Sequence, residues 1–175
     1  MITGGVDVTH DGVTLDGLTI NGSYDSTSEG TDLHNGIFVQ ASNVTIENST
    51  LTGDIGDSRP FSTSGSATNF NFTHNLVQGW NEGAYLTNGT TGSVTHDSFT
   101  NDGNGVLTET TAVDISHDAF SGSQGADVAP LPFTDATIGD FVHDNTYSSG
   151  HDRQISVYLN GPDGQTVTGS DVSTT

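Results

Sequence analysis

Residues 93–100, Ser-Val-Thr-His-Asp-Ser-Phe-Thr, are followed 21 positions later by residues 114–121, Asp-Ile-Ser-His-Asp-Ala-Phe-Ser. Each copy places one apolar residue five positions before another, with small polar residues between them. Seven segments share this pattern, and their starts lie 21 to 31 residues apart. A repeat of that length without helical periodicity is typical of one coil of a β-solenoid. The segments are Leu15–Ile20, Ile46–Leu51, Phe72–Val77, Val94–Phe99, Ile115–Phe120, Val142–Tyr147 and Val167–Val172.

The apolar spacing predicts three short strands in each coil. Apolar residues two positions apart, such as Val113 and Ile115, indicate a strand with one buried face. A tight polar turn follows, and the next apolar residue begins a second strand. A third strand is expected upstream, after a glycine that would supply a positive φ at a corner. This third strand is predicted at residues 36–40, 83–87, 105–109 and 155–159.

These patterns predict an all-β protein, a right-handed parallel β-helix of about seven coils stacked ~4.8 Å apart. Residues 1–175 are expected to form a single domain. Loops are predicted where the repeats lie farther apart. They are Tyr24–Asn35, Gly53–Gly65, Ala129–Asp135 and Ser148–Asp152.

Neither end of the sequence shows a capping helix. Exposed ends of a solenoid can template further strand pairing. We therefore expect a fragment or module of a longer chain, with end-to-end self-association or a partner that covers the ends.

The chain is strongly acidic. Its 22 acidic residues against two arginines, Arg59 and Arg153, give a formal net charge of −20. Nucleic acid is an improbable partner because it is bound by cationic groups that release counterions. Membrane insertion is not expected either, since no run approaches the ~20 apolar residues of a membrane span. The fold type and the acidity predict an extracellular or cell-surface location.

Divalent cations suit such a surface, and calcium comes first because it takes oxygen ligands. A saline habitat explains the charge equally well. Asp54 and Asp57, three positions apart in a glycine-rich loop, are the candidate calcium ligands, and a solvated acidic loop is the alternative. The calcium-roll and EF-hand signatures are absent, so any calcium site would be irregular. No other cofactor is expected.

Two adjacent columns of the turn carry residues that tolerate left-handed backbone or bond to their own turn. The main interpretation is a structural ladder down one corner of the solenoid. The alternative is a transition-metal site at the three histidines, although rings stacked along a corner do not converge on one point. The histidines also predict a pH effect, because neighbouring like charges disfavour joint protonation. The ladder residues are His74, His96 and His117 in one column and Asn75, Asp97 and Asp118 in the next.

The strand after the corner glycine offers side chains that could contact a glycan. Its outward positions are predicted to be Phe38 and Gln40, Tyr85 and Thr87, and Leu107 and Glu109. Aromatic side chains combine an apolar face with a polar edge, which suits stacking against sugar rings. The glycan-binding candidates are Phe38, Trp80, Tyr85 and Tyr158. For Trp80, which follows a glycine at a corner, packing over the solenoid edge is the main interpretation and sugar contact the alternative.

The repeat pattern resembles right-handed β-helix proteins that act on acidic polysaccharides, namely pectate lyases, polygalacturonases and mannuronan C5-epimerases. Residues 155–162, Ile-Ser-Val-Tyr-Leu-Asn-Gly-Pro, followed by residues 167–169, Val-Thr-Gly, look like the closing coil of an alginate epimerase module. Those epimerases carry an Asp two places and a His four places after the strand glycine, and this chain does not match that motif. The resemblance implies Glu109 as acid or base and Tyr85 as proton donor, with His34 and Arg153 near the cleft.

The sequence thus predicts a β-helix module with a structural or glycan-binding role in a larger secreted or surface protein. The alternative is a calcium-dependent polysaccharide lyase or uronate C5-epimerase. The repeat alone does not decide between them, because unrelated activities share it. A binding module retains a glycan without forming product, whereas a lyase leaves a new double bond and an epimerase changes the stereochemistry of the uronate.

Overall fold

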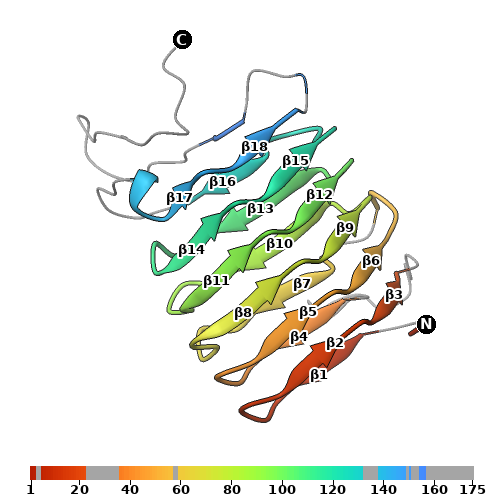
Figure 1. Ribbon diagram of the computed structural model, residues 1–175, viewed down its shortest axis with the longest axis vertical. Coiled ribbons are helices and arrows are strands. Elements are labelled where there is room, and N and C mark those ends of the chain that lie inside the picture. Colours follow the sequence, from red (N-terminus) through yellow and green to blue (C-terminus); the bar gives the residue numbers. More distant parts are fainter. Residues whose placement is uncertain are drawn as a thin grey trace.

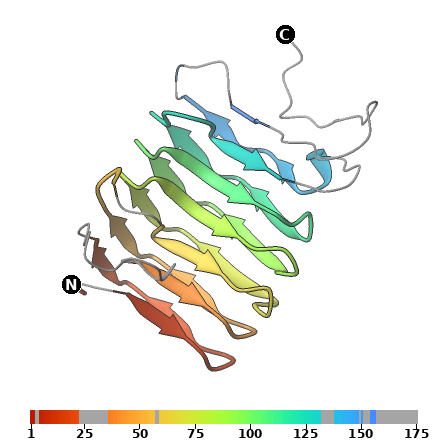
Figure 2. The same cartoon turned by 180° about the vertical axis from the view of Figure 1, so that it is seen from behind.

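The computed structural model describes residues 1–2, 5–22, 36–56, 59–131, 138–148, 150 and 154–156. These residues form an all-β parallel solenoid with three strands per coil, which confirms the predicted fold class (Figure 1). Figure 2 shows the same stack of coils from behind. Within the described residues, no helix is long and apolar enough to cross a membrane.

Three parallel sheets of six strands run along the solenoid. The first sheet consists of β1 (Val6–Val8), β4 (Ile37–Val39), β7 (Phe61–Thr63), β10 (Glu82–Leu86), β13 (Asn104–Thr108) and β16 (Val128–Pro130). The second sheet consists of β2 (Thr14–Asp16), β5 (Thr45–Glu47), β8 (Phe70–Thr73), β11 (Gly92–Thr95), β14 (Val113–Ser116) and β17 (Val142–His143). The third sheet consists of β3 (Thr19–Asn21), β6 (Thr50–Thr52), β9 (Leu76–Gln78), β12 (Ser98–Thr100), β15 (Ala119–Ser121) and β18 (Thr146–Tyr147). A short 3-10 helix, η1 (Ile138–Asp140), precedes β17.

The predicted number of about seven coils is wrong. Each sheet has six strands. In the described part of the chain, about four coils are complete, each with another coil above and below it. They lie at residues 37–52, 61–78, 82–100 and 104–121. The seventh sequence repeat, Val167–Val172, lies outside the described residues. Of the strand predicted at 155–159, Ile155 makes an isolated bridge to Val128, and residues 157–159 are not described.

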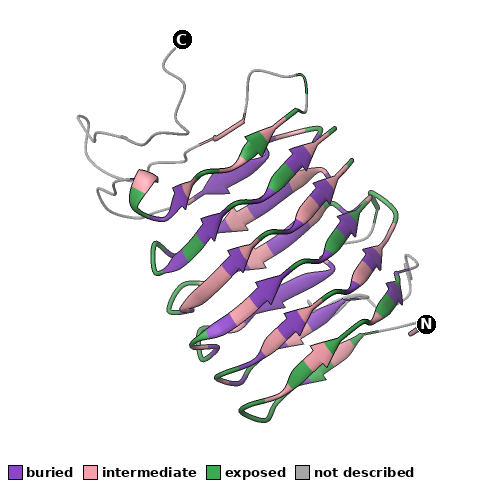
Figure 3. Cartoon of the chain, in the orientation of Figure 1, coloured by how far each residue is buried: buried purple, intermediate pink, exposed green. Residues whose placement is uncertain are grey.

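Like side chains from successive coils lie directly above one another. In the second sheet Ile46, Phe72, Val94, Ile115 and Val142 are aligned partners, and all are buried. Figure 3 shows buried segments, in purple, in successive coils. This register follows from the repeat, because every coil must place its apolar positions in the same narrow interior. The stacking on which the fold prediction depends is therefore present.

A column of aromatic rings fills the interior of the third sheet. The Phe99 and Phe120 ring centroids are 5.1 Å apart, and Tyr147 continues the column 5.6 Å beyond Phe120. Both phenylalanines are fully buried. The corner glycines make room for these rings, since a Cβ on Gly83 would lie 2.7 Å from Phe99 and one on Gly105 2.7 Å from Phe120.

The prediction of a positive φ at these corner glycines is therefore wrong. Gly36, Gly83 and Gly105 do not have the left-handed backbone found at several other glycines of the described chain. A larger residue at these positions is excluded by close packing rather than by backbone conformation.

Two strands of the first sheet lie in segments that were predicted to be loops. β7 falls within Gly53–Gly65 and β16 begins just before Ala129–Asp135. Their sequences, Phe-Ser-Thr and Val-Ala-Pro, are short and show no clear alternation of apolar and polar residues. Pairing with the neighbouring coils, as between Ser62 and Tyr85 or between Ala129 and Leu107, makes them strands.

Candidate functional site

The outer face of the first sheet brings four polar or charged side chains together. They are Arg59, Glu82, Tyr85 and Glu109, and we call them the outer cluster. Arg59 precedes β7, Glu82 begins β10, and Glu109 follows β13, so the cluster spans three successive coils. Tyr85 points outward because its neighbours on β10, Ala84 and Leu86, fill the interior.

The outer cluster is a continuous chain of contacts. Arg59 Nε donates a hydrogen bond to Glu82 Oε2 at 2.6 Å. The guanidinium carbon of Arg59 lies 3.8 Å from the centroid of the Tyr85 ring, which is a cation–π contact. The Tyr85 hydroxyl donates to Glu109 Oε1 at 2.5 Å.

The electrostatics of the outer cluster favour a protonated tyrosine. Burial, with the hydrogen bond to the Glu109 carboxylate, raises the pKa of Tyr85 to about 12. The phenol is therefore a hydrogen-bond or proton donor at neutral pH. One arginine against two glutamates leaves the cluster with a net charge of −1. Its only cation, Arg59, is already paired with Glu82.

Phe38 lies on the same face as Tyr85, with Ser62 of β7 between them. Because neighbouring strands are about 4.8 Å apart, the two aromatic residues lie about 10 Å apart along the solenoid. Leu107 follows Tyr85 on the next strand. Phe38, Tyr85 and Leu107 are all partly exposed, so they form a partly apolar strip beside the polar groups of the outer cluster.

Arg59 and Glu82 were not predicted as site residues. Arg59 stands just before β7, the strand that the sequence did not reveal, so its position beside β10 could not be derived. Glu109 and Tyr85, which were predicted as a pair, are brought together by the pairing of β10 with β13.

Trp80 does not lie on the outer face. Its predicted packing role at the solenoid edge is confirmed, and its candidacy as a glycan-binding residue is wrong. Its side chain is fully buried, and its Nε1–H donates to the Leu51 carbonyl oxygen at 3.0 Å. The indole packs over Gly22 and Gly53, where an added Cβ would collide with the ring. The ring therefore fills the corner across neighbouring coils, and no face is left for a sugar.

Several predicted residues fall outside the described part of the chain. They are His34, Asp57, Arg153 and Tyr158. Asp54 is exposed, and its Oδ1 accepts a hydrogen bond of 3.4 Å from the Gly56 N–H. In the described ranges, no three His, Cys, Asp or Glu side chains are arranged to hold a metal ion. Calcium binding at Asp54 and Asp57 stays a prediction.

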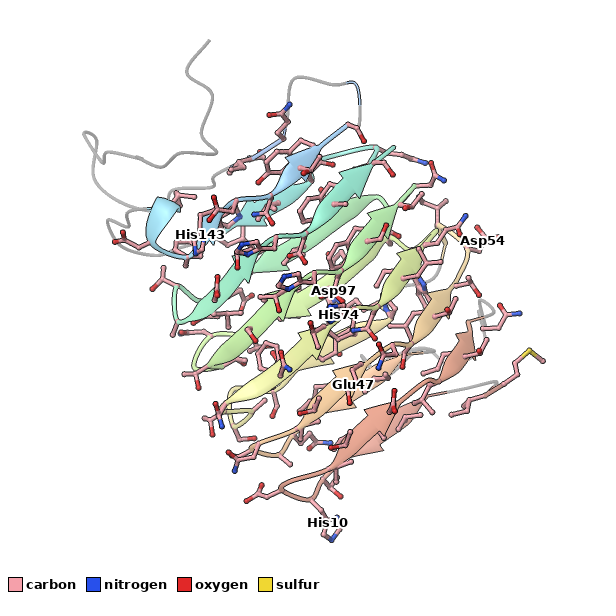
Figure 4. The ribbon with its side chains drawn as sticks, viewed as in Figure 1. His10, Glu47, Asp54, His74, Asp97 and His143 are labelled. Carbon is pink, nitrogen blue, oxygen red and sulfur yellow. The ribbon has the colours of Figure 1, made fainter. Side chains whose placement is uncertain are left out.

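His74, His96 and His117 form an exposed stack on the turn between the second and third sheets. Figure 4 labels His74 in this stack. The ring centroids are 5.1 and 5.0 Å apart, and the planes are nearly parallel. All three residues have left-handed backbone, with φ of 57°, 61° and 60°. Parallel rings stacked along a corner do not converge on one point, whereas a tetrahedral metal site needs ligands that converge.

The neighbouring turn column points inward and links the coils. The Ser49 N–H donates to Asn75 Oδ1 at 2.9 Å, and the Asn75 N–H donates to Asp97 Oδ1 at 2.6 Å. The Asp97 N–H then donates to Asp118 Oδ1 at 2.8 Å, and the Asp118 N–H to Asn145 Oδ1 at 2.9 Å. We call this column the turn ladder. The sequence predicted Asn75, Asp97 and Asp118 as members of this column, but not that their side chains bond one coil to the next.

No family model, curated protein or solved structure matches this chain. The resemblance to polysaccharide lyases and C5-epimerases therefore rests on the repeat pattern and the last predicted coil alone. The structure shows the coarser class, a parallel β-solenoid.

Proposed function

We propose that this chain is a solenoid module that binds a glycan on the outer face of the first sheet, as part of a larger secreted or surface protein. The observation that carries the proposal is the pair of partly exposed rings, Phe38 and Tyr85, beside the hydrogen-bonding groups of the outer cluster. A sugar ring offers an apolar face that suits an aromatic side chain and hydroxyls that suit carboxylate and guanidinium groups. A few fixed polar groups beside an apolar surface are typical of ligand sites.

The charge of this face favours an uncharged glycan. Arg59 is neutralised by Glu82, so no free cation of the outer cluster is left for a uronate carboxylate. The formal charge of −20 adds long-range repulsion of any polyanion. A uronate polymer would bind only if calcium bridged its carboxylates to those of the protein.

Affinity electrophoresis against immobilised neutral and uronate polysaccharides, with and without calcium, tests this proposal. We expect retention of the protein by a neutral glycan. Tyr85→Ala or Phe38→Ala should weaken retention about tenfold, which corresponds to about 1.4 kcal/mol.

Leu76→Ala is the matched control, because Leu76 is an exposed apolar residue on the third sheet and should not affect retention. Retention by no glycan, or equal retention of all three variants, would contradict the proposal.

One contact favours a second candidate, a polysaccharide lyase or uronate C5-epimerase. The Tyr85 hydroxyl and the Glu109 carboxylate lie side by side on the outer face, so one bound sugar ring would be within reach of both a proton donor and a proton acceptor. Glu109 would take the proton from the carbon next to the uronate carboxylate. Tyr85 would give its proton to the departing glycosidic oxygen in a lyase, as the C–O bond breaks and the new double bond forms, or back to the same carbon in an epimerase. Incubation with alginate or pectin, with and without calcium, decides between the candidates. A product that absorbs in the near ultraviolet, or an altered uronate stereochemistry, lost in Tyr85→Phe and Glu109→Gln, would establish the enzyme.

A further inference from the structure

Two members of the turn ladder, Asp97 and Asp118, carry carboxyl groups at positions where Asn75 and Asn145 carry amides. Its amide members show the pattern. Asn75 Oδ1 accepts an N–H from the preceding coil, and its Nδ2 donates to the Ile46 carbonyl oxygen at 3.1 Å. Asn145 Nδ2 likewise donates to the Ile115 carbonyl oxygen at 3.0 Å. Each amide thus uses one acceptor and one donor to join two coils.

Asp97 and Asp118 stand between these amides in the same column. Their Oδ1 atoms make the acceptor bonds of the ladder. Their Oδ2 atoms are buried and have no hydrogen-bond partner. Both residues are almost fully buried, with 3% and 1% of their surfaces exposed. An ionised carboxylate in this position would leave a charge in the solenoid interior without a partner.

The strand register identifies the carbonyl that is equivalent, for each aspartate, to the one that an asparagine Nδ2 binds. Ile46 is aligned with Phe72, Phe72 with Val94, and Val94 with Ile115. Since asparagine Nδ2 atoms bond to the carbonyls of Ile46 and Ile115, the equivalent acceptors for Asp97 and Asp118 are the carbonyls of Phe72 and Val94. Two oxygens with lone pairs attract each other only when a proton lies between them.

We propose that Asp97 and Asp118 are neutral carboxylic acids in the folded protein, each donating its proton to a carbonyl of the preceding coil, and that their ionisation weakens the solenoid as the pH rises. A proton fits this place, because the amide nitrogens in the equivalent positions are at hydrogen-bond distance from their carbonyls. A calcium ion does not fit, because it needs six to eight oxygen ligands. This inference is independent of the proposed glycan role.

Among the described residues, no lysine or arginine lies beside the pair to hold the charged form. His74, His96 and His117 lie on the outside of the same turn. His143 of β17 pairs with Asp114 of β14, and Asp114 adds repulsion at Asp118. Arg59, the one arginine among the described residues, pairs with Glu82 on the first sheet. Burial raises the pKa of Asp97 to about 8, and burial with repulsion from Asp97 raises that of Asp118 to about 9. The two groups titrate as a coupled pair.

The direction of the pH effect follows from linkage. The folded chain holds protons on this pair that the unfolded chain releases near pH 4, so stability is greatest in acid. It should fall as the pH rises from about 4 to about 9, the upper limit being set by Asp118.

The double variant Asp97→Asn/Asp118→Asn tests this effect because it replaces each acid with an amide of the same shape. Thermal unfolding should show similar melting temperatures for the variant and wild type near pH 4. At pH 9 the variant should melt at least about 5 °C higher. The control is Asp7→Asn/Asp140→Asn, which removes two exposed carboxylates and should keep the pH slope of the wild type. Parallel curves for the double variant and wild type would overturn the proposal.

Native electrophoresis at pH 6 gives a second readout. Asp97→Asn/Asp118→Asn should leave the mobility of the folded protein unchanged, whereas the exposed control should slow it by two charges. Equal slowing of both variants would show that the buried pair is ionised.

Carboxyl ¹³C NMR titration of the wild type decides the question even if the double variant does not fold. Burial also raises the pKa of Asp102 to about 7, so the pair is read from two further resonances with midpoints near 8 and 9. These two should not respond to calcium or EDTA, and midpoints near pH 4 or a calcium-dependent shift would refute the assignment.

Discussion

Truncation of Phe120 to alanine is expected to be the most damaging change in the aromatic column. Phe120 is fully buried and lies between two other rings, with centroids 5.1 Å from Phe99 and 5.6 Å from Tyr147. Its ring also occupies the space that Gly105 leaves open. The neighbouring coils are hydrogen-bonded along three sheets, so they cannot collapse freely into the cavity.

The structure indicates how much stability each truncation should cost and which of the two should cost more. Removal of a buried phenylalanine side chain costs about 3–5 kcal/mol, including the cavity term. A ring pair contributes about 0.5–1.5 kcal/mol beyond area burial. Phe120 loses two ring contacts and Phe99 only one within the column. We therefore expect Phe120→Ala near the upper end of the range and Phe99→Ala about 1 kcal/mol below it.

Guanidinium unfolding followed by circular dichroism measures this difference. Both variants should lower the denaturation midpoint. The transition should also broaden, because coils of a solenoid are stabilised by nearest neighbours and a weak interface uncouples them. Leu76→Ala, at an exposed position, should cost less than about 0.5 kcal/mol. A Phe120→Ala midpoint no lower than that of Leu76→Ala would refute the interior column, and equal losses for Phe99 and Phe120 would refute the argument from ring contacts.

Three further predictions follow from the described contacts. Trp80→Phe leaves the buried Leu51 carbonyl without its donor and should lower the free energy of unfolding by about 1–3 kcal/mol, measured by chemical unfolding. The variant should retain glycan as the wild type does. Loss of glycan retention without loss of stability would contradict the buried position of Trp80. Phenolate absorbance should show one tyrosine that ionises near pH 12. This transition should be absent in Tyr85→Phe and should move to lower pH in Glu109→Gln, and the stability of the wild type should decline as the pH rises from 10 towards 12. A titration curve unchanged in both variants would count against the hydrogen bond. Calcium or sodium chloride should raise the melting temperature by relieving the repulsion of a chain at −20, and a melt indifferent to salt, calcium and EDTA would contradict this.

The columns of the second and third sheets could be predicted because the repeat itself encodes them. Residues such as Phe72 and Val94 occupy the same place in successive copies, and stacking of coils brings equal places together. The left-handed turn at His74, His96 and His117 was predictable for the same reason, since Asn and Gly occupy that column in other coils. A pattern that repeats along the chain thus reports contacts that are distant in sequence.

The outer cluster and the corner packing could not be predicted, because they depend on contacts that occur once. Arg59 meets Tyr85 only because β7 pairs with β10, and β7 carries no pattern of its own. The burial of Trp80 is decided by Gly22 and Gly53, which lie in other coils. In each case the deciding residue lies outside the repeat column, so spacing gives no signal.

The proposed protonation of Asp97 and Asp118 means that composition alone overestimates the negative charge of the folded protein. The formal charge of −20 counts every carboxyl group as ionised. If Asp97 and Asp118 are neutral in the fold, the charge near neutral pH is −20 + 2 = −18, and the missing charges come from the interior. The signal in the sequence is that Asp97 and Asp118 stand between Asn75 and Asn145 in one column of the turn. A position that uses an amide as both donor and acceptor can hold a carboxyl group only if that group keeps its proton.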